Sequence, residues 1–153
     1  VPAERNAHPH LSNDASLALV HNGNLVNANA LKREFELKGS IFQTTADTEV
    51  IAYAIARQRL ECKSIEEAVL KATRQLVGAF SLIVMSGEKL IAARDPWGFR
   101  PLCIGEVDGS IMFASESCAF PVLGGHLIRE VEPGEVVVAD LGVGTREYEL
   151  IEL

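Results

Sequence analysis

The segment His21-Asn22-Gly23 contains the residue types from which an oxyanion hole can be built. An Asn side-chain amide and a Gly backbone N–H are donors that stabilise a tetrahedral intermediate, and each is typically worth about 3 kcal/mol. His21 is of the type that most often serves as a general base, although a His beside a turn is more often structural. The alternative is a tight Asn-Gly turn after a strand over residues 17–20, and the pair taken alone favours that turn.

The segment from Thr44 to Glu49 places a carboxylate, Asp47, where a helix is expected to begin. Functionally, an acid at the mouth of a helix can hold the α-ammonium of an amino-acid substrate. Structurally, an acidic N-cap or first-turn residue interacts favourably with the positive end of the helix dipole and needs no further role. Taken alone, the segment favours the structural explanation.

The segment from Arg94 to Leu102 has two Pro, a Gly, two Arg and the only Trp of the chain within nine residues. This composition predicts a rigid loop between strands, because Pro fixes φ and Gly permits tight turns. We expect a salt-bridged structural turn here rather than direct catalysis.

The elements that must position these segments change in type along the chain. Helices are expected early, over residues 28–38 with Asn27 as N-cap, over 47–60, and from the Ser64–Glu67 capping box to about Gly78. The later strands are predicted over 80–86, 89–93, 101–105, 110–114, 127–131, 135–140 and 146–151, with a short helix over 117–122. Helices followed by antiparallel strands predict an α+β fold with helices packed on sheet faces.

Length and composition limit the classes of protein. The 153 residues fit one domain, and a net charge of −7 without a basic stripe argues against nucleic-acid binding. The basic residues of the expected helices are interpreted as a solvated face: Lys32, Arg33, Lys71 and Arg74. The apolar stretch over residues 79–85 is far shorter than the ~20 residues of a membrane span. Three widely spaced cysteines predict neither a disulfide framework nor a four-cysteine zinc site, and they suit the cytosol.

Taken together and in order, the segments resemble the class II glutamine amidotransferase domain. Within that group the chain looks most like the amidophosphoribosyltransferase family, and the resemblance covers about Asn6 to Glu135. The motifs that carry it are Ala18-Leu-Val-His-Asn-Gly-Asn-Leu-Val-Asn27, Phe42-Gln-Thr-Thr-Ala-Asp-Thr-Glu-Val50, Gly78-Ala-Phe-Ser81, Arg94 to Leu102, Ala114-Ser-Glu-Ser-Cys-Ala119 and Val131-Glu-Pro-Gly-Glu135.

The resemblance implies an αββα sandwich of the N-terminal nucleophile hydrolase type, here incomplete at its N-terminus. It implies that an N-terminal cysteine attacks the glutamine carboxamide, with its own α-amine as base, and that ammonia passes to phosphoribosyl pyrophosphate on a second domain. Asn22 and Gly23 match the oxyanion-hole positions, and Asp47 matches the carboxylate that binds the substrate ammonium.

The chain departs from the family at its first residue, Val1, because the family's nucleophile and its Gly-His-Val-Arg-Tyr segment are missing. We therefore expect residues 1–153 to be a partial glutaminase domain of a longer protein, inactive alone, without the phosphoribosyltransferase domain. Missing strands would leave sheet edges open, which predicts association with further copies of the chain.

Cofactors are expected in the longer protein rather than in these residues. Some members of the family bind a [4Fe–4S] cluster, and Cys118 resembles one of its ligands, while Mg²⁺ would serve the absent domain. Two alternatives remain open: another class II amidotransferase such as asparagine synthetase, and a nucleophile-free paralogue that acts as an interaction domain.

Overall fold

The computed structural model describes residues 4–12, 16–87, 89–140 and 144–145 of the chain. In chain order the elements are η1 (Glu4–Asn6, a 3-10 turn), β1 (His10–Leu11), β2 (Ala18–Leu25), α1 (Ala28–Leu37), α2 (Asp47–Arg59), α3 (Ile65–Thr73), β3 (Gly78–Ser86), β4 (Lys89–Arg94), β5 (Cys103–Val107), β6 (Ser110–Ala114), α4 (Ala119–Val122), β7 (His126–Glu130), β8 (Val136–Asp140) and β9 (Gly144–Thr145). The α+β prediction is confirmed.

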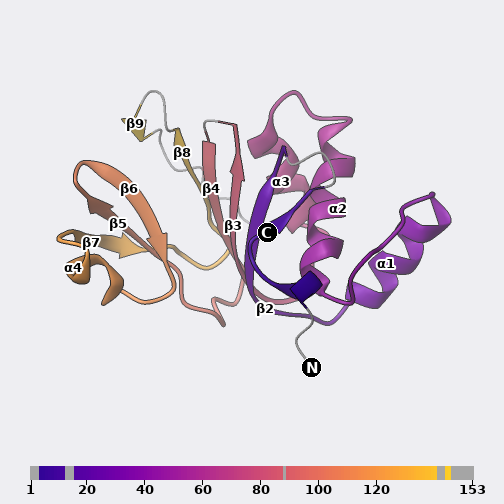
Figure 1. The fold of residues 1–153 in the computed structure, drawn as a ribbon, viewed down its shortest axis with the longest axis horizontal. Coiled ribbons are helices and arrows are strands. Elements are labelled where there is room, and N and C mark those ends of the chain that lie inside the picture. The colour runs from indigo at the N-terminus through magenta and orange to yellow at the C-terminus, as the bar shows by residue number, and fades with distance from the viewer. Residues whose placement is uncertain (1–3, 13–15, 88, 141–143, 146–153) are drawn as a thin grey trace.

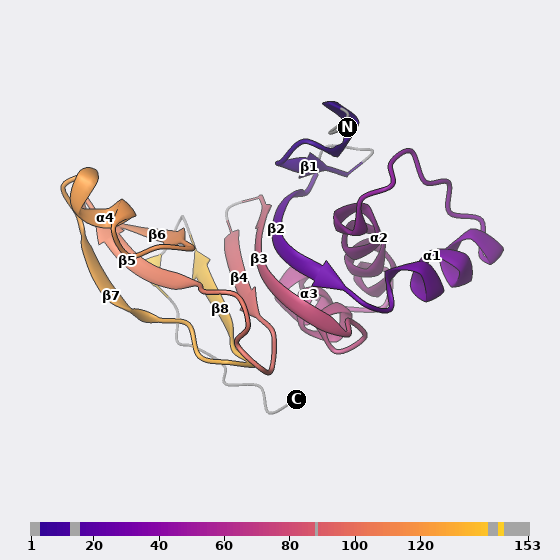
Figure 2. The same cartoon turned by 90° about the horizontal axis from the view of Figure 1, so that it is seen from below.

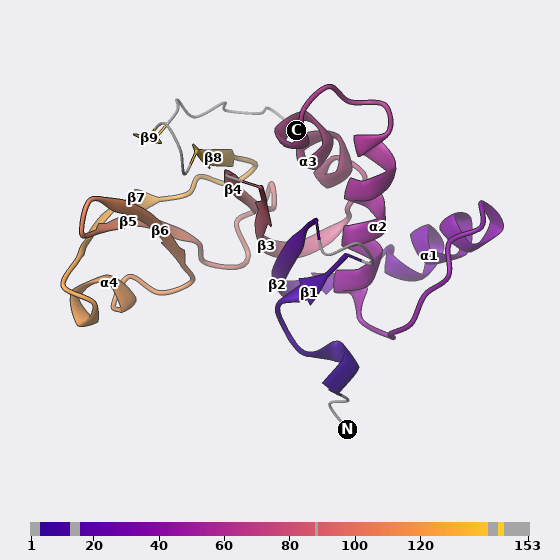
Figure 3. The same ribbon diagram turned by 45° about the horizontal axis from the view of Figure 1, so that its top comes forward.

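The strands form two antiparallel sheets that lie between helical layers. The larger sheet has the order β1-β2-β3-β4-β8-β9, and the smaller one has the order β6-β5-β7. Helices α2 and α3 cover one face of the larger sheet, and α1 packs against the outer side of α2 (Figures 1 and 2). The smaller sheet lies on the other side of the larger one, and the short α4 lies beyond it. Figure 3 shows the same order of layers. The arrangement is that of an αββα sandwich.

Two hydrophobic cores hold the layers together. The first lies between the helices and the larger sheet, where Ile51 and Ile55 of α2 pack with Leu19, Phe80 and Leu82 of β2 and β3. These strand residues share a face because side chains alternate along a strand. The second core lies between the two sheets and contains Ala92, Leu102, Ile104, Phe113, Val131, Val137 and Ala139.

The sequence placed most elements within a few residues, and the Ser64 capping box is confirmed by a hydrogen bond from the Glu67 backbone N–H to Ser64 Oγ. One boundary was wrong. The third helix ends at Thr73 rather than near Gly78, because 3-10-type bonds tighten its last turn and Gly78 already begins β3. The expected strand over 146–151 lies outside the described residues.

Asn27 occupies the N-cap position of α1, but its side chain does not cap the helix. Its amide instead donates to the carbonyl oxygen of Gln75 and accepts from the backbone N–H of Val77, at 2.8 and 3.0 Å. The side chain thus ties the β2–α1 junction to the segment that leads into β3. This tie holds the end of β2 in place at the edge of the candidate site.

Candidate functional site

The segment His21-Asn22-Gly23 lies inside β2 and does not form a turn. The strand continues to Leu25, and Asn22 and Gly23 lie opposite Ser81 and Phe80 of β3. The expected Asn-Gly turn is therefore wrong, because the glycine serves a close approach of two strands. A Cβ at Gly23, whose φ is +150°, would lie 2.0 Å from the carbonyl oxygen of Ala79.

Asp47 is the first residue of α2, and β2 holds both of its carboxylate oxygens. Oδ1 lies 3.2 Å from Nδ1 of His21, and Oδ2 accepts the backbone N–H of Leu25 at 3.1 Å. Burial alone would raise the pKa of Asp47, but the hydrogen bond and charge of His21, with the N–H groups of Leu25 and Thr48, hold that pKa below its ordinary value. Asp47 is therefore an anion at neutral pH.

Gly23 and Asp47 line the same open pocket, which has a volume of about 450 Å³. Its walls come from β2, the first turns of α1 and the start of α2, and they comprise Gly23, Asn24, Leu25, Ala28, Asn29, Lys32, Thr45, Ala46, Asp47 and Val50. Asn22 is not among the lining residues, and its exposed side chain lies on the face of β2 opposite the buried His21. The structure thus brings two of the three candidate residues to one pocket and leaves the third beside it.

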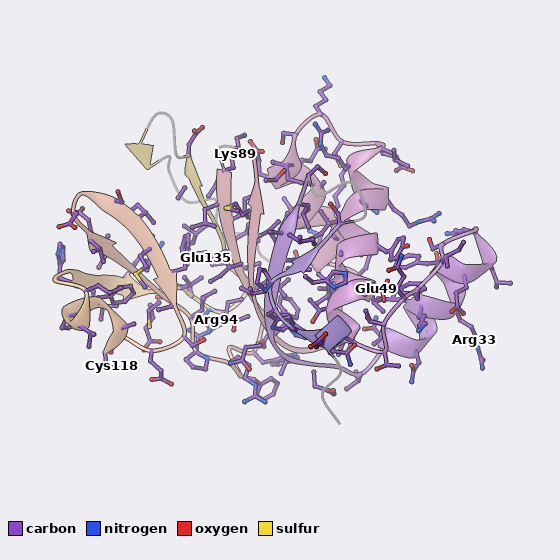
Figure 4. The ribbon with its side chains drawn as sticks, in the orientation of Figure 1. Arg33, Glu49, Lys89, Arg94, Cys118 and Glu135 are labelled. Atoms are coloured by element: carbon purple, nitrogen blue, oxygen red, sulfur yellow. The ribbon has the colours of Figure 1, made fainter. Side chains whose placement is uncertain are left out.

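Lys32 is a pocket residue that the sequence interpretation assigned to a solvated face. Its Nζ donates to the carbonyl oxygen of Thr44 at 3.3 Å and lies 4.9 Å from the centroid of the Phe42 ring. Arg33, the next residue on α1, is exposed as expected and projects away from the molecule in Figure 4. The available signal was helical spacing, since Ala28, Asn29 and Lys32 share one face of α1.

Glu49 organises the loop that forms one wall of the pocket, a role that sequence reasoning missed. The side chain is 3% exposed, and its carboxylate accepts the backbone N–H groups of Gln43 and Thr44 and the hydroxyl of Thr44, at 2.7–2.8 Å. Burial alone would raise the pKa of Glu49, but these bonds lower it below its ordinary value. The loop that carries Thr45 and Ala46 is therefore anchored to α2 from inside.

The loop after β4 is structural, as expected, but hydrogen bonds to carbonyls hold it more than salt bridges do. The Arg94 guanidinium donates to the carbonyl oxygens of Gly98, Arg100 and Val131, at 2.6–3.1 Å, while Glu130 lies 3.5 Å away. Asp95 is fully buried, and its carboxylate accepts backbone N–H groups from Phe80, Trp97 and Phe99.

Glu135 lies near Arg94 between the sheets (Figure 4) and is almost fully buried. Its carboxylate makes two parallel contacts with the Arg129 guanidinium, at 2.6 and 2.7 Å, and accepts the backbone N–H of Glu132. Burial would raise the pKa of Glu135, but Arg129 and that N–H hold it below its ordinary value. The pair fixes the turn between β7 and β8.

The three cysteines of the sequence lie away from the pocket. Cys62 is buried after α2, Cys103 is buried in β5, and Cys118 is exposed immediately before α4. Figure 4 shows Cys118 at the far end of the smaller sheet, well separated from Glu49 among the helices. Burial, followed by the nearby charge of Glu130, raises the pKa of the Cys103 thiol, which makes it a poor nucleophile.

The fold and the pocket define a class of protein. The family model described as glutamine amidotransferase domain matches residues 1–121, which is most of the chain, and the chain belongs to this family. The predicted fold type, an N-terminal nucleophile hydrolase sandwich, is confirmed by the solved relatives.

Within that class the chain is similar to amidophosphoribosyltransferases. The relative from Methanocaldococcus jannaschii is 44% identical over 126 residues, which are 82% of this chain and 27% of the relative. The relative from Bacillus subtilis is 43% identical over 139 residues, which are 90% of this chain and 29% of the relative. The solved glutamine phosphoribosylpyrophosphate amidotransferase from B. subtilis, complexed with ADP and GMP, has a TM-score of 0.88 and 40% identity, covering 97% of this chain and 32% of that one.

The chain therefore spans about 30% of the length of these relatives. Over that part, the resemblance stated from the sequence motifs is confirmed. In the described part of the chain, no helix combines the length and apolarity that a bilayer crossing requires.

Proposed function

We propose that residues 1–153 are the glutamine-binding part of a longer amidophosphoribosyltransferase. That protein would hydrolyse glutamine and pass the ammonia to phosphoribosyl pyrophosphate on a second domain, giving phosphoribosylamine for purine synthesis. The observation that carries the proposal is that Gly23 and Asp47, 24 positions apart in the sequence, line one pocket. The similarity to amidophosphoribosyltransferases supports phosphoribosyl pyrophosphate as the acceptor of the ammonia.

In this proposal the two ends of glutamine are recognised separately. The α-ammonium binds the ionised Asp47 carboxylate, and Lys32 in the same pocket gives the α-carboxylate a cationic neighbour. The side-chain carboxamide then lies against the Gly23 backbone, where the N–H of Gly23 and the side-chain amide of Asn22 would stabilise the oxyanion. One anion and one cation in a pocket of this size suit a zwitterionic amino acid.

The attacking thiolate must come from outside these residues. Attack on the carboxamide carbon forms the tetrahedral intermediate, ammonia leaves to give a thioester, and water releases glutamate. None of Cys62, Cys103 and Cys118 lines the pocket. The chain alone would therefore bind glutamine without hydrolysing it.

Substitution of Asn22 in the longer protein tests the oxyanion assignment. Asn22→Ala should lower kcat for glutamine hydrolysis about 100-fold with little change in KM, because the lost donor acts on the transition state. Arg33→Ala, which removes an exposed side chain of α1 outside the pocket lining, is the control and should retain most of kcat. A normal kcat for Asn22→Ala would refute the role, and glutamine binding without any ammonia release by the longer protein would favour the interaction-domain alternative.

A [4Fe–4S] cluster does not fit the described residues by themselves. They contain no group of three or more His, Cys, Asp or Glu side chains able to hold a metal, and Cys118 is a single exposed thiol. We propose Cys118 as one ligand only together with thiolates from beyond this chain, where a Mg²⁺ site would also lie. Loss of iron from the longer protein on Cys118→Ser, but not on Cys62→Ala, would support this assignment.

Self-association and a cytosolic location complete the proposal. The outer strands β6 and β7 of the smaller sheet are edges within the described residues, and Leu127 and Ile128 of β7 are each 42% exposed. Open edges with exposed apolar side chains favour pairing between copies. A sedimentation profile of monomers alone would contradict self-association.

Three cysteines that form no disulfide suit a reducing compartment, which supports the proposed cytosolic location.

A further inference from the structure

His21 is a buried histidine in contact with the proposed substrate-binding carboxylate. Its side chain is 2% exposed and points from β2 toward α2, and its Nδ1 lies 3.2 Å from Oδ1 of Asp47. The other ring nitrogen, Nε2, is buried and has no hydrogen-bond partner among the described residues. A buried ring nitrogen without a partner is unfavourable, so the fold retains this imidazole at a cost. The contact with Asp47 is the interaction that offsets this cost.

The two contacts of Asp47 define the direction in which its carboxylate faces. His21 holds Oδ1 and the backbone N–H of Leu25 holds Oδ2, and these two residues lie on either side of Gly23 in β2. Each carboxylate oxygen can accept more than one hydrogen bond, so capacity remains for an ammonium group. The Asp47 side chain is 23% exposed, and it faces the pocket that Gly23 also lines.

We propose that His21 is a positioning residue for glutamine: it fixes the Asp47 carboxylate in the orientation that receives the substrate's α-ammonium. This inference rests on the proposed function. Without His21, only the backbone N–H groups of Leu25 and Thr48 would hold the carboxylate, and the group could rotate more freely about its last bond. Because His21 and Gly23 are two residues apart in a paired strand, the sheet also fixes the separation between the ammonium end and the carboxamide end of the substrate.

The groups around His21 come from two other elements. Asp47 and Thr48 belong to α2, and Thr48 Oγ1 is held by Nε2 of His8 at 3.0 Å. His8 and His10 precede β2, and the charges of His21 and His10 both lower the pKa of His8, after its partial burial. Asp47 is the anion of this cluster.

The test compares three His21 variants of the longer protein on two substrates. His21→Leu removes the contact, His21→Gln places its amide near Nε2 rather than Nδ1, and His21→Asn places an amide nitrogen near the position of Nδ1. The substrates are L-glutamine and 4-carbamoylbutanoate, which is glutamine without its α-amino group, and ammonia release gives kcat and KM for both.

We expect His21→Leu and His21→Gln to raise KM for L-glutamine about tenfold, the size of a lost hydrogen bond to a charged group, with kcat changed less than about threefold. His21→Asn should restore most of the affinity. With 4-carbamoylbutanoate, all three variants should match the unsubstituted protein, because that substrate has no ammonium to place.

Equal losses on both substrates, or no rescue by His21→Asn, would overturn the inference and leave His21 a structural residue. If His21→Leu does not fold, the His21→Gln variant is sufficient, because a normal KM for L-glutamine in that variant would refute the positioning role of His21. A different result would test the proposed function rather than the role of His21. If the unsubstituted protein neither binds nor hydrolyses L-glutamine, the proposed function itself fails.

Discussion

Gly23 lies so close to Ala79 in the neighbouring strand that a Cβ at Gly23 would come within 2.0 Å of the Ala79 carbonyl oxygen. Gly78 makes the reciprocal approach from β3, where a Cβ would lie 2.4 Å from the carbonyl oxygen of Asn24. The two strands therefore meet closely at the point where Gly23, which has no side chain, lines the pocket.

Replacement of Gly23 by Ala should destabilise the fold by about 3 kcal/mol or more, because the methyl group meets backbone that cannot move without breaking the β2–β3 pairing. Gly39→Ala is the matched control: Gly39 also has a positive φ, +91°, but no atom lies within 4 Å of its added Cβ. The control should lose only about 1 kcal/mol, from backbone strain. Chemical unfolding of both variants measures the difference, and equal losses would contradict the close-approach argument.

Asp47→Asn in the longer protein should weaken glutamine binding roughly 10- to 100-fold, because a neutral amide replaces a charged acceptor for the substrate ammonium. Calorimetric titration with L-glutamine measures the change. Glu34→Gln, which removes an exposed carboxylate paired with Lys38 on the surface of α1, is the control and should leave affinity unaltered. An Asp47→Asn protein with normal affinity would show that the ammonium binds elsewhere.

Lys32→Met should raise KM for glutamine by roughly three- to tenfold, because the pocket loses the cation that faces the substrate carboxylate while the aliphatic part of the side chain is kept. Lys38→Met is the control on the same helix, since Lys38 pairs with Glu34 on the surface. The comparison also tests the corrected placement of Lys32. Equal kinetics for both variants would mean that Lys32 has no role in substrate binding and belongs to the solvated face of α1.

The Arg129–Glu135 pair predicts a loss of stability in acid. The pKa of Glu135 is lower in the folded state than in the unfolded state, so its stabilisation is complete above the ordinary, unfolded-state pKa of a glutamate and is lost as the pH falls through the lower folded-state pKa. Glu135→Gln should flatten the dependence of unfolding free energy on pH in that window. At neutral pH it should cost about 3 kcal/mol, because it removes the buried negative charge that the Arg129 guanidinium binds through two hydrogen bonds.

Unfolding monitored between pH 2 and 7, with Glu36→Gln on the exposed side of α1 as control, measures this effect. A Glu135→Gln protein with an unchanged acid slope would mean that other carboxylates dominate.

The 153-residue chain alone should release no glutamate from glutamine above the uncatalysed rate. Its three cysteines lie outside the pocket, and the raised pKa of Cys103 disfavours the thiolate that attack requires. A glutamate-release assay at neutral pH, with the triple variant of Cys62, Cys103 and Cys118 to Ser as control, provides the measurement. Turnover that disappears in the triple variant would show that one of these thiols reaches the substrate.

Local patterns predicted the elements well because they depend on neighbouring residues. The capping box at Ser64 is complete within four positions, and it is present. The motif at Asn22-Gly23 was harder to interpret, because a turn glycine and a glycine required by an adjacent strand have the same local sequence. Only the partner strand, 56 positions further along at Ala79, distinguishes them.

The site residues that belong to a family motif could be predicted from the sequence. Those whose role depends on a contact between distant residues could not. Asp47 and Gly23 were identified by resemblance, and they do line one pocket. Lys32 and Glu49 were missed, because their roles follow from bonds to the loop over residues 42–46, which sequence spacing does not reveal. His21 was considered as a base, whereas its buried contact with Asp47 depends on the packing of α2 against β2.

The loop after β4 keeps its shape from within. Arg94 and Asp95 bind its backbone through hydrogen bonds. Trp97 and Phe99 project into solvent from this backbone and are 75% and 68% exposed. A surface that covers these two rings would meet them already in place and would lose little conformational freedom in doing so. The hydrogen bonds of Arg94 and Asp95 thus hold Trp97 and Phe99 in position whether or not another surface covers them.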